Sequence, residues 1–98
     1  MGHYIANLRD IEFCLFDLFG REKVLGTSLY SEIDRETAMG MLEEVKRMCE
    51  NDLADSFVEG DRIGTDFNKA TGDVKLPESF KKSYKAYIDG EWWRVDAP

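Results

Sequence analysis

The fold class is decided by residues 34–57, which read DRETAMGMLEEVKRMCENDLADSF. Apolar side chains recur there every three or four positions as far as Phe57, and charged side chains lie mainly between them. This spacing predicts an amphipathic helix of about 20–25 residues, because one face of an α-helix repeats every 3.6 residues. Asp34 is the expected N-cap of this helix, and the Asn51-Asp52 pair marks a weak point or a break in it.

A second apolar run lies near the N-terminus. Residues 8–19 predict a helix that is capped by Asn7 and ended by Gly20. Its helical stripe contains Ile11, Cys14, Leu15 and Leu18, and three phenylalanines fall outside that stripe: Phe13, Phe16 and Phe19. A helix that is apolar over so much of its circumference needs packing partners on more than one side.

The remaining segments predict a turn region and a third helix. From Gly60 to Leu76 the periodicity fails and Gly, Asp and Asn are frequent, which indicates an irregular loop or a short hairpin around residues 62–76. Pro77 fits the first position of the next helix, and Gly90 ends it. Its expected apolar face consists of Phe80, Tyr84, Tyr87 and Ile88. The predicted fold is therefore mainly all-α, a three-helix segment with this loop or hairpin.

Composition and charge restrict the function. The chain has 98 residues, enough for one small domain, and carries a net charge of −7. Net negative charge disfavours a general binder of nucleic acid or of an anionic membrane, so neither partner is expected. Lys81, Lys82 and Lys85 are interpreted as a solvated helix face. We expect a cytoplasmic protein, because there is no signal peptide or long apolar run and because Ala6 stands where a myristoylation signal needs Ser or Thr.

The sequence contains no recognisable catalytic, cofactor-binding or metal-binding constellation. His3, the only histidine, has no Cys, Asp or Glu at a spacing suited to zinc. Ser56 and Ser79 lack a nucleophile-elbow context, and neither glycine-rich phosphate-binding motif occurs. We therefore predict no catalytic, cofactor-binding or metal-binding residue in this chain.

Two further groups of residues receive structural interpretations. Cys14 and Cys49 lie far apart and are expected to be reduced, buried thiols. The acidic residues of Glu59-Gly60-Asp61 do not follow the pattern of an EF-hand loop and are expected to mark a helix end.

The C-terminal stretch carries Trp92, Trp93 and Val95, and apolar residues of this size need something to pack against. Together with the first helix, they indicate that part of the natural core lies outside this sequence. From its residues alone, the chain is a small, acidic, mostly helical domain with excess apolar surface.

Several stretches resemble one family of enzymes. They are Met1-Gly2-His3-Tyr4, Asn7-Leu8-Arg9-Asp10, Ser56-Phe57-Val58-Glu59-Gly60-Asp61-Arg62, Leu76-Pro77-Glu78-Ser79-Phe80-Lys81-Lys82 and Gly90-Glu91-Trp92-Trp93-Arg94-Val95-Asp96-Ala97-Pro98. Together they resemble the start of bacterial acyl-CoA dehydrogenases that carry an extra N-terminal segment, a subgroup with long-chain acyl-CoA and 3-methylthiopropanoyl-CoA enzymes.

The resemblance implies a larger parent enzyme. Such an enzyme has an N-terminal helical domain, a middle β-domain and a C-terminal helical bundle, with FAD between the last two. A carboxylate base far downstream removes the α proton of the acyl-CoA, and the β hydrogen leaves as hydride to the flavin, which gives a 2-enoyl-CoA. None of these functional residues has a matching position here, so residues 1–98 are expected to be an incomplete helical segment without the FAD and catalytic domains.

The leading hypothesis is therefore a structural segment that is inactive alone and contacts the remainder of the dehydrogenase chain or its subunits. The parent would be a homo-oligomer that takes acyl-CoA. The expected contact surfaces are the Phe13, Phe16, Phe19 face and the Trp92-Trp93 end. The alternative is a stand-alone helical protein-interaction module that uses the same apolar surface. A small enzyme complete in itself is disfavoured, because no acid, base and oriented partner occur together.

Overall fold

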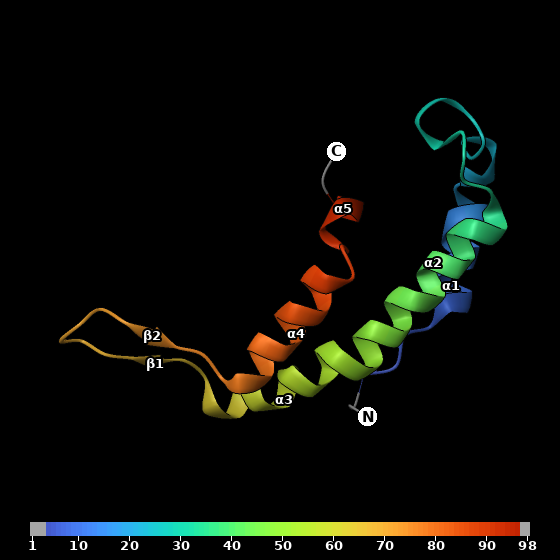
Figure 1. The fold of residues 1–98 in the computed structure, drawn as a ribbon. Coiled ribbons are helices and arrows are strands. Elements are labelled where there is room, and N and C mark those ends of the chain that lie inside the picture. Colours follow the sequence, from blue (N-terminus) through green and yellow to red (C-terminus); the bar gives the residue numbers. More distant parts are fainter. Residues whose placement is uncertain (1–3, 97–98) are drawn as a thin grey trace. The chain divides into compact units, whose positions relative to one another are not determined.

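The computed structural model describes residues 4–96 (Figure 1). The described chain is mainly helical and contains one small antiparallel hairpin, which confirms the predicted fold class. It divides into two compact units. One is Ile5–Arg47, and the other contains the residues from Met48 onward together with Tyr4.

The first unit begins with α1, Leu8–Glu12, which continues directly into a π-helical segment, Phe13–Leu18. The Asn7 side chain accepts a hydrogen bond from the Asp10 backbone N–H at 3.3 Å, so the predicted N-cap is confirmed. Gly20 follows in the left-handed conformation with φ 58°, which ends the helical run as expected.

The π-helical segment changes which side chains of this run are buried. A π-turn contains more residues than an α-turn, so the side chains after it are rotated relative to the 3.6-residue pattern. Phe16 is the buried side chain, at 8% exposure, whereas Ile11, Cys14 and Leu18 of the predicted stripe are exposed. The expectation of a buried Cys14 thiol was therefore wrong, and so was the placement of Phe16 outside the packed face.

Two short 3-10 turns, Arg21–Lys23 and Ser28–Tyr30, connect this run to α2, Arg35–Met48. The Asp34 carboxylate accepts a hydrogen bond from the Thr37 backbone N–H at 2.7 Å and so caps α2, as predicted.

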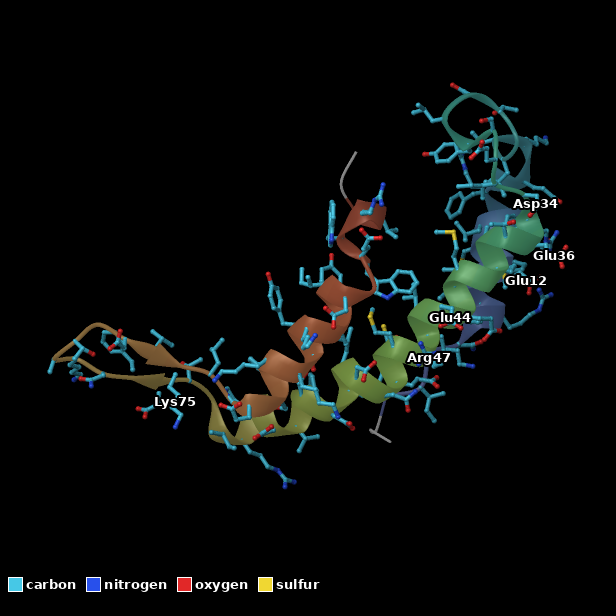
Figure 2. All side chains as sticks on the ribbon, in the orientation of Figure 1. Glu12, Asp34, Glu36, Glu44, Arg47 and Lys75 are labelled. Atoms are coloured by element: carbon cyan, nitrogen blue, oxygen red, sulfur yellow. The ribbon has the colours of Figure 1, made fainter. Side chains whose placement is uncertain are left out.

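Arg35, at the start of α2, contacts three other segments of the first unit. Its guanidinium forms ion pairs with Glu12 at 2.9 Å and with Glu22 at 3.4 Å. The same group lies over the Phe16 ring, 4.6 Å from the centroid. One side chain thus links α1, the π-helical segment and the first 3-10 turn to α2. Figure 2 labels Glu12 and Asp34 in this unit.

We expect the first unit to lose stability in acid. The hydrogen bond from Arg35 lowers the pKa of Glu12 below its ordinary value of 4.5. Because the folded pKa is the lower one, the contribution is present above the unfolded pKa and is lost as the pH falls through the folded pKa. Urea unfolding from about pH 6 to about pH 3 should show a steeper acid loss for wild type than for Glu12→Gln. Parallel profiles for the two proteins would contradict this role of Glu12.

In the second unit, the helical run continues from α2 through a π-helical turn, Cys49–Leu53, into α3, Ala54–Ile63. Asn51-Asp52, predicted to mark a weak point or a break, lies inside the π-turn, where the regular α-helix is interrupted although the helical run continues. The expected helix end at Glu59-Gly60-Asp61 was wrong, because α3 runs to Ile63 and stops at Gly64. Phe57 is 65% exposed. Because the π-turn shifts the helical phase, Phe57 does not continue the buried stripe of α2.

A hairpin and a third helix complete this unit. Strands β1, Asp66–Phe67, and β2, Val74–Lys75, pair antiparallel, so the region around residues 62–76 is a short hairpin. Helix α4 spans Glu78–Asp89 and ends at Gly90 as predicted, but Pro77 is its N-cap and not its first helical residue. A short helix, α5, spans Trp93–Asp96.

Helices α3 and α4 lie side by side (Figure 1) and meet where Gly60 faces the Phe80 ring. The buried Ser83 hydroxyl donates a hydrogen bond to the Asp52 carbonyl of the π-turn at 2.7 Å. The packed face of α4 therefore passes through Phe80 and Ser83. Tyr84, predicted on that face, is 66% exposed because it lies about 100° further round the helix than Ser83.

Gly60→Ala should destabilise the second unit by about 1–3 kcal/mol, because a Cβ at this position overlaps the Phe80 ring. Gly40→Ala is the matched control, since no atom lies within 4 Å of a Cβ placed there. That control should gain about 0.5–1 kcal/mol from helix propensity. Urea unfolding measures both, and equal gains at the two positions would show that α3 and α4 do not pack closely at Gly60.

Candidate interaction surface

Within residues 4–96, no group of three or more His, Cys, Asp or Glu could hold a metal ion. His3 lies outside the described residues. Ser56 donates its hydroxyl to the Leu53 carbonyl at 2.8 Å, and the buried Ser79 hydroxyl has no hydrogen-bond partner. Neither serine hydroxyl is therefore hydrogen-bonded to the base that a nucleophilic serine needs.

The three lysines of α4 are exposed, and two of them form ion pairs with carboxylates of the same helix. Lys81 contacts Glu78 at 2.8 Å, Lys85 pairs with Asp89, and Lys82 is exposed. Because carboxylates of the same helix neutralise two of these charges, the interpretation as a solvated face is confirmed. No helix in the described part of the chain has the length and apolarity that a membrane span requires.

A hollow of the second unit lies at the base of the hairpin and has a volume of about 320 Å³. It is lined by Glu59, Ile63, Gly64, Asp66, Lys75, Leu76, Pro77 and Glu78. This volume is at the lower end of the range for drug-sized ligands. Its three carboxylates against one lysine would repel the pyrophosphate of FAD. The residues of this hollow therefore do not fit that cofactor.

Neither cysteine has a disulfide partner in the structure. Cys14 is exposed, whereas Cys49 is half-buried at the start of the π-turn. Burial and, to a smaller extent, the neighbouring Glu50 raise the pKa of the Cys49 thiol above its ordinary value. A raised pKa disfavours the thiolate, so Cys49 is poorly suited to act as a nucleophile.

The functional feature that remains is exposed apolar surface. Among the described residues, the buried hydrophobic side chains are only those of Phe16, Met48 and Ala54.

Many large apolar side chains are exposed in both units. In the first unit the exposed ones include Ile5, Phe13, Leu18, Phe19, Leu29 and Tyr30, and in the second unit Phe57, Ile63, Phe67, Val74, Tyr84, Trp93 and Val95. Three phenylalanines were predicted to form one contact face. Phe13 and Phe19 are exposed, but Phe16 is buried beneath Arg35 and does not belong to that face. At the other predicted surface, Trp93 is exposed and Trp92 is half-buried.

Comparison with known proteins identifies the relationship. No family model matches the chain. Over 95 residues it is 47% identical to a broad-specificity linear acyl-CoA dehydrogenase of Mycobacterium tuberculosis and 34% identical to a 3-methylmercaptopropionyl-CoA dehydrogenase of Ruegeria pomeroyi. The chain is homologous to the N-terminal part of acyl-CoA dehydrogenases.

The acyl-CoA dehydrogenase homology confirms the resemblance found in the sequence. Each alignment covers 97% of this chain but 16% of the relative, so the chain spans about a sixth of the length of these dehydrogenases. The exposed apolar side chains thus belong to a segment that, in its relatives, is joined to a much longer chain.

Proposed function

We propose that this chain is a structural segment of an FAD-dependent acyl-CoA dehydrogenase that oxidises acyl-CoA to 2-enoyl-CoA. The segment is inactive alone and packs against the remainder of the enzyme. The observation that carries the proposal is the exposed apolar surface on a chain that matches 16% of its relatives. Covering one large apolar side chain contributes up to about 1.5–3 kcal/mol, so several such contacts would hold the segment firmly in place.

The described residues would contribute packing and not chemistry. FAD supplies the hydride acceptor of the proposed reaction, and the hollow at the base of the hairpin does not fit it. The remainder of the parent chain would therefore hold the cofactor, the acyl-CoA and the base. Within the segment, the Arg35 contacts and the α3–α4 packing would keep the two units in the conformations that the remainder recognises.

The decisive test is the intact mass of the gene product in its native host, together with its visible flavin absorbance. A flavin-bearing product several times larger than 11.3 kDa that oxidises acyl-CoA is expected. A colourless product of 98 residues would overturn the proposal. The same exposed apolar side chains would then support a stand-alone interaction module.

The exposed phenylalanines of the first unit provide a second test in the full-length enzyme. Phe19 is 60% exposed, so Phe19→Asp removes a side chain that the described residues cover only in part. If the remainder of the enzyme covers this side chain, the variant should lose about 1–3 kcal/mol of stability, measured by chemical denaturation. Asp17→Asn, at a neighbouring exposed position, is the control and should be neutral.

Equal stability of the Phe19→Asp and Asp17→Asn enzymes would remove Phe19 from the contact surface. Phe16→Asp does not serve as this test. It places a charge in the packed site beneath Arg35 and should unfold the first unit whether or not any partner contacts it.

A further inference from the structure

The β1–β2 hairpin has one apolar and one charged face. Phe67 lies directly opposite Val74, and Asp66 lies opposite Lys75. Because successive side chains of a strand point to opposite sides, Phe67 and Val74 share one face, and Asp66 and Lys75 share the other. Both apolar side chains are 56% exposed. Figure 1 shows the hairpin extending beyond the ends of α3 and α4, and Figure 2 labels Lys75 on it.

The turn of this hairpin is specified by its own residues. The Asn68 backbone N–H donates to the Asp73 carbonyl at 2.8 Å, and the Asn68 side chain accepts from the Ala70 N–H at 2.9 Å. Gly72, at φ 79°, donates its N–H to the Asn68 carbonyl at 2.8 Å. Local hydrogen bonds thus define the turn, but two paired strands alone are only marginally stable in water.

The base of the hairpin carries two further exposed apolar side chains. Leu76 follows β2 directly and is exposed. Leu76 and the exposed Ile63 at the end of α3 line the same hollow. That hollow is also lined by Asp66 and Lys75, so it lies against the charged face of the hairpin. The apolar face therefore consists of Phe67 and Val74, which we call the hairpin face and which are both more than half exposed.

We propose that the hairpin face is a docking surface for the remainder of the acyl-CoA dehydrogenase chain. This inference rests on the proposed function and adds the site of contact. The relatives extend far beyond the matched segment, which covers 16% of their length, so a covalently joined partner is available in a full-length enzyme.

The small size of the hairpin face favours a tethered partner over a second copy of this chain. Two half-exposed side chains present roughly 200 Å², whereas a stable complex of separate molecules buries about 800 Å² on each partner. A tethered partner is held at an effective concentration in the millimolar range, so a contact of this size is sufficient.

The test compares Val74→Cys with Lys75→Cys in the full-length, flavin-bearing enzyme. The two positions are adjacent, lie on opposite faces, and are both exposed in this structure. The rate of maleimide labelling at each position is read by peptide mass spectrometry, which separates it from labelling at Cys14 and Cys49. We expect labelling at position 74 to be at least about tenfold slower, because a covered thiol reacts only after local opening. Urea should remove the difference.

Similar labelling rates at the two positions in a flavin-bearing enzyme would overturn the docking surface and leave the proposed function intact. Protection at position 74 that disappears on dilution of an oligomer to its monomer would assign the contact to a second copy and also overturn it. A native product of 98 residues without flavin would refute the proposed function, and this inference with it.

Discussion

The structure depends on one constraint: short helical segments in two separate units bury very few of their own apolar side chains. Phe16, Met48 and Ala54 are the buried hydrophobic residues of the described chain. Burial of apolar area is the main favourable contribution to folding, and a unit of about fifty residues has little of it to offset the loss of chain entropy. Specific contacts therefore contribute a larger share of the stability of each unit.

In the first unit that contact is the Arg35 guanidinium, which combines two ion pairs with a stacking contact on Phe16. In the second unit it is the close approach of α3 and α4 at Gly60, together with the hydrogen bond from Ser83 to the Asp52 carbonyl. Both arrangements fix which helix faces are turned inward. The outward faces, rich in Phe, Tyr, Trp and Ile, are the surfaces that we propose to contact other parts of an acyl-CoA dehydrogenase.

The sequence predicted excess apolar surface but misplaced several of its residues, and the two π-helical segments, Phe13–Leu18 and Cys49–Leu53, explain why. Each shifts the phase of the helix that follows, so a residue expected on the packed face can end on the exposed one, as Phe57 does. The second segment also contains the Asp52 carbonyl that accepts the Ser83 hydroxyl. A change of helical phase thus places polar and apolar groups where a regular α-helix would not.

The sequence by itself determined the helical class, the caps at Asn7 and Asp34, the stops at Gly20 and Gly90, the hairpin region and the relationship to acyl-CoA dehydrogenases. These features depend on local propensities or on similarity of sequence, which neighbouring residues carry. Tertiary structure alone decided that Phe16 is buried, that Cys14 and Tyr84 are exposed, and that α3 passes Gly60 and ends at Ile63. The physical reason is that burial depends on helical phase and on packing partners distant in sequence, such as Arg35 over Phe16 and Phe80 against Gly60.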